Sequence, residues 1–133
     1  SLVRRQVCNY KMNFEPTPFH QDCSFLPFKS LIINSWVPLT NCGVNSPSIQ
    51  VIVKPLNAFI TPEDYNNPIA KPYQKIELSE DFVKSNFDGE KIWAPEMHVG
   101  DVLFFSNFTV HRTFISKEMT ENRISLEIRC MQG

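Results

Sequence analysis

The sequence predicts an all-β protein, mainly β with few short helices, folded as a jelly roll whose closed form is the double-stranded β-helix. Short runs rich in Val, Ile, Phe and Tyr recur along the chain, with Pro, Gly, Asn or Ser between them. Helical periodicity is almost absent. A chain of 133 residues forms one domain with a single modest core. Eight or nine short strands with polar excursions between them are typical of a β-sandwich or a jelly roll.

The expected elements follow from this pattern in chain order. We expect strands at 4–13, 19–25, 31–39, 48–54, 74–78, 91–94, 101–106, 109–115 and 123–130. Two single helical turns are expected between them. The segment 61–67 would be capped by Thr61, and the segment 78–87 would be capped by Ser79. Both are too short to form a layer of their own.

Several strands carry apolar residues on both faces. In the run 101–106, Val102 and Phe104 point to one side and Leu103 and Phe105 to the other. A two-layer sandwich buries only one face of each strand, so something else should cover the second. We expect either a homodimer that covers this exposed apolar face or an N-terminal helical region that residues 1–133 lack.

Composition excludes several classes of partner. Thirteen Lys and Arg residues are scattered among fourteen acidic ones, the net charge is −1, and there is no basic run, so nucleic acid is not expected. No apolar stretch has the length of a membrane span, and the start lacks the apolar block of a signal peptide. The four cysteines form no CxxC pair, and we interpret them as reduced thiols. These features favour a cytoplasmic protein without a membrane partner.

The first candidate for chemistry is the pair of His20 and Asp22 in "FHQD". Because side chains alternate along a strand, both should project to one side, with Gln21 pointing away. Two such ligands can reach one metal ion. The motif alone is weak, since about 0.3 His-x-acid triplets are expected by chance in this composition.

A third ligand would come from His98 or His111. His98 precedes a Gly-Asp turn, which is a natural solvent position, whereas His111 lies in an apolar run. A histidine in a buried strand is more often a core residue with satisfied hydrogen bonds than a ligand. The last strand weakens that reading, because Arg123 and Ser125 would point inward together as a fork for a carboxylate.

Two histidines and one carboxylate leave three positions of an iron ion open, which is the triad of non-haem Fe(II) oxygenases. A zinc site would more often be tetrahedral with three His or with Cys. The guanidinium and hydroxyl of the last strand would anchor a dicarboxylic acid beside the metal. The pattern therefore indicates an iron oxygenase with an acidic cosubstrate.

Four motifs carry a resemblance to a known family: "FHQD", "GDVLFF" at 100–105, "VH" at 110–111 and "NRISL" at 122–126. In order and spacing they resemble the Fe(II)- and 2-oxoglutarate-dependent dioxygenases, most closely the phytanoyl-CoA dioxygenase group. The resemblance implies that His20, Asp22 and His111 bind Fe(II). It also implies that Arg123 pairs with the distal carboxylate of 2-oxoglutarate.

Three further residues match positions of the family around the cosubstrate. Trp36 corresponds to an aromatic near 2-oxoglutarate, Thr113 to a hydroxyl position two past the distal histidine, and Ser125 to the second arm of an Arg-x-Ser pairing. The family implies hydroxylation of a small-molecule substrate with O2. Relatives also carry a substantial N-terminal region that packs helices on the outer sheet.

Two alternatives stay open on the sequence alone. One is a cupin-like metal-binding protein or isomerase that uses no 2-oxoglutarate, with Arg123 in a structural ion pair with Glu127 or Glu121. The other is a non-enzymatic β-sandwich module in which His20, Asp22 and His111 never meet. Metal analysis separates the second alternative from the first.

Overall fold

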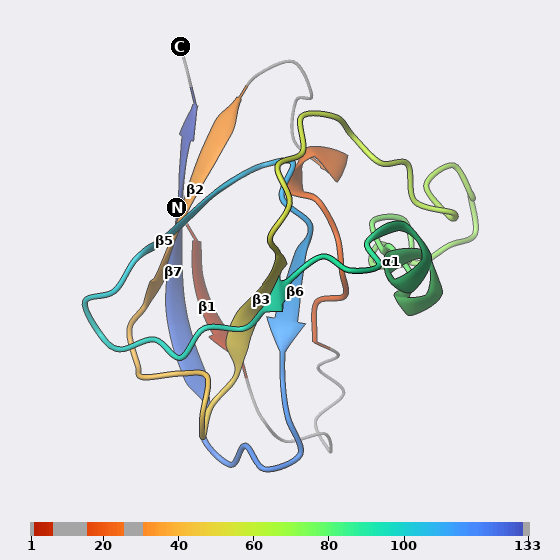
Figure 1. The fold of residues 1–133 in the computed structure, drawn as a ribbon. Coiled ribbons are helices and arrows are strands. Elements are labelled where there is room, and N and C mark those ends of the chain that lie inside the picture. The colour runs from red at the N-terminus through yellow and green to blue at the C-terminus, as the bar shows by residue number, and fades with distance from the viewer. Residues whose placement is uncertain (1, 7–15, 26–30, 132–133) are drawn as a thin grey trace.

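The computed structural model describes residues 2–6, 16–25 and 31–131, and its architecture is mainly β (Figure 1). Two antiparallel sheets face each other, one with strand order β1-β7-β2-β5 and one with order β4-β3-β6. The elements are β1 (Leu2–Gln6), the 3-10 helix η2 (Asp22–Ser24), β2 (Ile32–Pro38), β3 (Ser48–Ile52), α1 (Glu80–Asn86), β4 (Ile92–Trp93), β5 (Leu103–Ser106), β6 (His111–Phe114) and β7 (Arg123–Met131). The predicted jelly-roll fold class is confirmed.

Two apolar clusters hold the fold together. The first lies between the sheets, where Trp36 of β2 meets Ile49 and Val51 of β3. The second lies on the opposite side of the three-stranded sheet, where Ile52 packs with residues of α1 such as Val83. Side chains alternate along β3, so one strand serves both clusters. The helical side of the molecule thus covers the outer face of the smaller sheet (Figure 1).

The helix predicted after Ser79 is present as α1. Ser79 is its N-cap, and its hydroxyl accepts a hydrogen bond from the backbone N–H of Phe82 at 3.2 Å. Glu80 and Asp81 stand in the first turn and Lys84 in the last, which complements the helix dipole. Within the described ranges, no helix combines the length and the apolar character needed to cross a membrane.

Two expected strands are not strands in the structure. The segment 74–78 forms turns, although its last residue, Leu78, donates its N–H to the carbonyl of Phe19. The segment 19–25 makes a single β-bridge at His20 and then enters η2. Local turn hydrogen bonds replaced the expected ladder in both places. Of the strand expected at 4–13, residues 7–13, which include Cys8, lie outside the described part of the chain.

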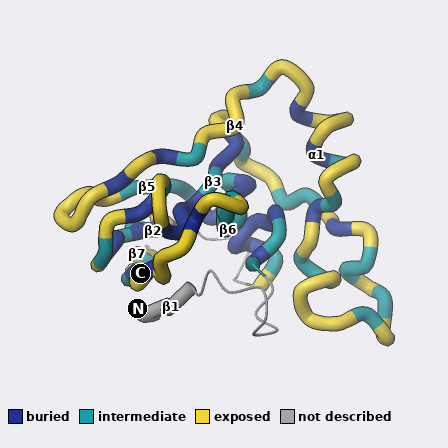
Figure 2. The backbone as a smooth tube through the Cα atoms, turned by 90° about the horizontal axis from the view of Figure 1, so that it is seen from below, coloured by how far each residue is buried: buried dark blue, intermediate teal, exposed yellow. Residues whose placement is uncertain are grey.

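The four-stranded sheet presents an apolar outer face. Along β7 the side chains alternate, with Arg123 and Ser125 buried and with Ile124 and Ile128 each 38% exposed. Phe104 of β5 is 65% exposed. It faces Ser35 of β2, which also faces Ile128 of β7, so these side chains share one side of the sheet. Figure 2 shows the alternation of buried and exposed residues along these strands.

We predict that this outer face associates or binds apolar probes. The purified chain is expected either to form a dimer or to bind a hydrophobic dye, because a contiguous exposed apolar patch is unfavourable in water. Light scattering and dye fluorescence measure the two outcomes. Phe104→Ser combined with Ile128→Thr should reduce both signals, and the exposed helical change Lys84→Met should leave them unchanged. A stable monomer that binds no dye would contradict the prediction.

Candidate metal centre

The fold brings together the three residues that the sequence singles out as ligands. One side-chain atom each of His20, Asp22 and His111 lies within 4.8 Å of the others, and all three residues are buried. Within the described ranges this is the one such group of three or more. The Oδ1 atom of Asp22 lies 3.5 Å from Nε2 of His20 and 3.6 Å from Nε2 of His111. That they bind a metal stays a prediction.

The backbone sets this geometry. His20 and His111 form an isolated antiparallel bridge, with their N–H and carbonyl groups paired at 2.9 and 3.0 Å. Their rings therefore lie side by side, 4.3 Å apart between centroids. Asp22 follows His20 on the same side, although the strand expected here is reduced to a single bridge. Gln21 is extended, with φ −112° and ψ 139°, and the chain then turns into η2 at Asp22.

Gln21 lies between the two ligands in sequence and points elsewhere, as alternation predicts. Its buried amide donates to the carbonyls of Ala58 at 3.1 Å and Phe108 at 2.7 Å, and its carbonyl accepts from the N–H of Ile60 at 2.8 Å. The thiol of Cys23 lies 3.7 Å from the same carbonyl. Gln21 thus ties the segment 58–60 to the backbone that carries the ligands.

Both histidines are fixed in the tautomer that a metal ligand needs. Nδ1 of His20 lies 2.7 Å from the carbonyl of Pro18, and Nδ1 of His111 lies 2.9 Å from the carbonyl of Thr109. A carbonyl oxygen only accepts, so each neutral ring carries its hydrogen on Nδ1. Nε2 of each ring is therefore the nitrogen that faces Asp22 and is available to a cation.

The charges of the group favour the ligand forms. Burial raises the pKa of the Asp22 carboxyl, but the hydrogen bond from His20 and the nearby charges of His111, His20 and Arg129 outweigh it, so the pKa lies below its usual range. Burial, aided by His20, lowers the pKa of His111 to about 4 although Asp22 opposes this effect. The site therefore offers a carboxylate and a neutral imidazole at neutral pH.

A pH dependence of stability follows for the metal-free protein. In the unfolded chain His111 gains a proton below about pH 6.5, whereas in the folded chain it does so only near pH 4. Unfolding free energy should therefore fall by up to about 3 kcal/mol as the pH decreases from 6.5 to 4. The lowered pKa of Asp22 adds a loss in the same direction only below about pH 4.

Urea unfolding with a chelator present, at pH 6.5 and pH 4.5, measures this loss. His111→Gln should flatten the dependence, whereas the matched change His98→Gln should preserve it because His98 is exposed. Equal loss in the unmodified chain and in His111→Gln would contradict the assignment.

A cavity extends from the three candidate ligands between the two sheets. It is lined by Trp36, Thr113, Arg123 and Glu127, among others. Arg123 is 3% exposed; its guanidinium lies 5.0 Å from the Trp36 ring centroid and donates to the carbonyl of Ser48 at 3.3 Å. The structure therefore places three candidate cosubstrate residues from the sequence, Trp36, Thr113 and Arg123, on the walls of one cavity.

Ser125 lies two residues past Arg123 on the inner face of β7 and is not among the residues that line this cavity. It is fully buried, and its hydroxyl has no hydrogen-bond partner within the part of the chain that the structure describes. A buried polar group without a partner is uncommon in folded proteins and often marks a ligand or an ordered water. Its position two residues from Arg123 is the one that the resemblance assigns to an Arg-x-Ser pairing.

His98 does not belong to the centre. Its side chain is 65% exposed, and its ring nitrogens lie 3.9 Å from carboxylate oxygens of Glu96 and Asp101. The fold therefore brings His111, and not His98, together with His20 and Asp22.

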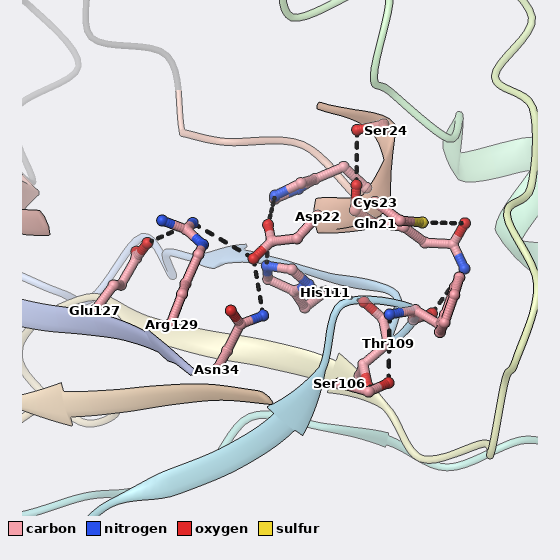
Figure 3. Close-up of polar contacts among 12 residues, drawn as sticks. Gln21, Asp22, Cys23, Ser24, Asn34, Ser106, Thr109, His111, Glu127 and Arg129 are labelled. Carbon is pink, nitrogen blue, oxygen red and sulfur yellow. Dashed lines mark hydrogen bonds and ion pairs between the residues drawn. The ribbon is translucent and has the colours of Figure 1, made fainter. Parts of the chain in front are cut away.

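The sequence did not point to two further residues at the centre. Asn34 and Arg129 both contact the second carboxylate oxygen of Asp22, as Figure 3 shows. Arg129 continues the inner face of β7, four residues past Ser125 and six past Arg123. Extending the same alternation from Arg123 would have found Arg129, and extending it back from Trp36 along β2 would have found Asn34.

Comparison with known proteins gives fold relatives only. No protein-family model matches the chain. No curated protein sequence matches it. Solved structures do match: EvdO2 from Micromonospora carbonacea var. aurantiaca, complexed with 2-oxoglutarate, has a TM-score of 0.69 at 15% identity, over 98% of this chain and 50% of that one.

Two proteins of nogalamycin biosynthesis match in the same way. The non-haem α-ketoglutarate-dependent carbocyclase SnoK has a TM-score of 0.60 at 18% identity, over 97% of this chain and 47% of its own. The non-haem α-ketoglutarate-dependent epimerase SnoN has a TM-score of 0.58 at 16% identity, over 96% and 43%. SnoN has also been solved with Fe3+, α-ketoglutarate and nogalamycin RO. The chain spans about half the length of these structures, and the likeness establishes the fold.

Proposed function

We propose that this chain is a double-stranded β-helix domain of an Fe(II)- and 2-oxoglutarate-dependent dioxygenase that hydroxylates a small molecule. One observation carries the proposal. The buried His20, Asp22 and His111 converge with Nε2 of both rings facing the carboxylate, at one end of a cavity that a buried guanidinium lines. The fold relatives complexed with 2-oxoglutarate and Fe3+ support it.

The donor set fits Fe(II). Two neutral imidazoles and one carboxylate are the ligands of the non-haem triad with three open positions. The backbone carbonyls that hold the Nδ1 atoms of His20 and His111 fix the orientation of the rings, as outer hydrogen bonds do in metal sites. Without a metal, Asp22 is shared between two imidazoles, and a cation bound there would take the place of a shared proton.

The rest of the cavity fits a dicarboxylic acid. We assign to Arg123 the distal carboxylate of 2-oxoglutarate, because its guanidinium is held in place by Trp36 and by the carbonyl of Ser48. The buried hydroxyl of Ser125 would donate to the same carboxylate. Thr113 lies on β6 between His111 and the end at which Arg123 contacts β3, so it would border the middle of the cosubstrate.

The chemistry then divides between cofactor and chain. When bound, Fe(II), 2-oxoglutarate and O2 together supply the oxidation of a C–H bond to an alcohol, with release of succinate and CO2. The chain holds the cosubstrate through Arg123, keeps water from the ligands by burying them, and maintains Asp22 as an anion. Hydroxylation is our assignment within a fold that also includes a carbocyclase and an epimerase.

The proposal also includes a narrower family within the dioxygenases and a cellular location. The motifs "FHQD", "GDVLFF" and "NRISL" favour the phytanoyl-CoA dioxygenase group. A cytoplasmic location is supported by Cys23, Cys42 and Cys130, which are free thiols. Because the chain spans about half the length of its fold relatives, the activity of the whole protein is part of the proposal rather than of the fold comparison.

An anaerobic titration tests the function. Fe(II) and 2-oxoglutarate added together should give a visible charge-transfer band, and admission of O2 should then give succinate. Metal binding without the band would indicate the cupin-like alternative. No metal binding at all would indicate the non-enzymatic module, and both outcomes contradict the dioxygenase.

A further inference from the structure

Asp22 presents its two carboxylate oxygens to different neighbours. Oδ1 faces the imidazole nitrogens of His20 and His111, while Oδ2 accepts from the side-chain amide of Asn34 at 2.8 Å and from the guanidinium of Arg129 at 3.4 Å. Figure 3 shows Asn34, Arg129 and His111 around the carboxylate of Asp22, with Arg129 and Asn34 joined to it by dashed lines. We call Oδ1, which faces the two imidazoles, the inner oxygen of Asp22, and Oδ2, which faces Asn34 and Arg129, the outer oxygen.

The amide of Asn34 has only one possible orientation here. A carboxylate accepts hydrogen bonds and donates none, so the nitrogen of Asn34 must face Asp22 and its oxygen must face away. Asn34 is 4% exposed, and its oxygen has no hydrogen-bond partner among the residues described. The same holds for Nε of Arg129, which is a donor.

These two groups complement each other. Asn34 and Arg129 are register partners on β2 and β7, so the unpaired acceptor and the unpaired donor lie on side chains that face each other. A small closing movement or one bridging water would pair them. Glu127 holds Arg129 from the other side at 3.2 Å. The four side chains thus form one charged network that ends on Oδ2.

We propose that Asn34 and Arg129 are positioning residues that hold the outer oxygen of Asp22 and so restrict this ligand to coordination through Oδ1. The inference rests on the proposed function. Two imidazoles and a single carboxylate oxygen leave three positions open on a six-coordinate ion, which a two-oxygen cosubstrate and O2 require. A carboxylate free to bind through both oxygens would close one of those positions.

Metal binding without turnover tests this role. Mn2+ affinity is measured by calorimetry at pH 8 for the unmodified chain, Asn34→Ala, Asn34→Asp and Arg129→Gln. Loss of an outer hydrogen bond to a ligand typically weakens metal binding 10- to 100-fold, so about this loss is expected for Asn34→Ala and for Arg129→Gln. Asn34→Asp should also change the affinity, because it replaces the hydrogen-bond donor at Oδ2 with a second carboxylate.

A spectroscopic readout separates positioning from general destabilisation. The absorption of bound Co2+ reports the number and arrangement of its ligands, so it should change in Asn34→Ala and in Arg129→Gln. The exposed matched changes Asn66→Ala and Lys84→Met should leave both the spectrum and the Mn2+ affinity unaltered. Circular dichroism of each metal-free variant establishes that it is folded, and Arg129→Gln serves if Asn34→Ala is not.

The outcomes distinguish the inference from the function on which it rests. An unmodified chain that binds no Mn2+ overturns the proposed function. An unmodified chain that binds Mn2+, with Asn34→Asp and Arg129→Gln equal to it in affinity and in Co2+ spectrum, overturns the positioning role and leaves the function intact.

Discussion

Replacement of His20 by alanine is expected to abolish the retention of iron by the purified chain and, with it, the formation of succinate. His20 supplies one of the three candidate ligand atoms that lie within 4.8 Å of one another. An imidazole and a carboxylate alone form a much weaker site than the full triad. Iron content after gel filtration, measured per chain, should fall from near one to background.

A matched control makes this result interpretable. His98→Ala removes an exposed imidazole that lies outside the centre, and it should leave the iron content unchanged. Because His20 packs against His111 and Phe25, His20→Gln is a second variant that retains more of the packing. Iron retained by both His20 variants, together with undiminished succinate, would show that the site is wrong.

Replacement of Arg123 by glutamine is expected to weaken 2-oxoglutarate binding about 30-fold or more. Truncating one partner of a buried, hydrogen-bonded charge pair costs roughly 2–5 kcal/mol, and each 1.4 kcal/mol is a factor of ten. Arg123 is buried and borders the cavity in which we place the cosubstrate. Titration of the anaerobic charge-transfer band with 2-oxoglutarate measures the dissociation constant directly.

The conservative variant separates charge from geometry. Arg123→Lys keeps the positive charge but lacks the planar fork, so it should recover only part of the affinity. Iron affinity should be nearly unchanged in both variants, because Arg123 is not a ligand of the centre. Unaltered 2-oxoglutarate binding in Arg123→Gln would instead favour the alternative in which Arg123 is purely structural.

Much of the fold follows from rules that act within a few residues. Alternation predicts that Arg123 and Ser125 are buried and that Ile124 and Ile128 face outward, and the structure has them so. The cap at Ser79 predicts α1, because side-chain capping is a local interaction. The sequence did not predict η2. A single 3-10 turn is too short to leave a periodic pattern of apolar residues in the sequence.

In the candidate site, too, local sequence patterns predict some residues, and contacts set by strand pairing are not predicted. Sequence spacing selects His20, Asp22, His111 and Arg123, since each stands in a motif or on the inner side of a strand. The partner of Asp22 at Asn34 depends on the register between β2 and β7, whose residues stand far apart in the chain. Register is a property of the assembled sheet, and one sequence carries little information about it.

Gln21 connects the candidate ligands to the segment 58–60 in an unusual manner, because all three of its strong contacts there and at Phe108 are to main-chain groups. Hydrogen bonds to the main chain do not depend on which side chains the segment 58–60 carries. The exposed residue Ala58 can therefore be replaced, in nature or in a library, while the candidate ligand atoms nearby keep their places. A main-chain anchor of this kind lets the segment 58–60 change its side chains without moving the backbone that carries the candidate ligands.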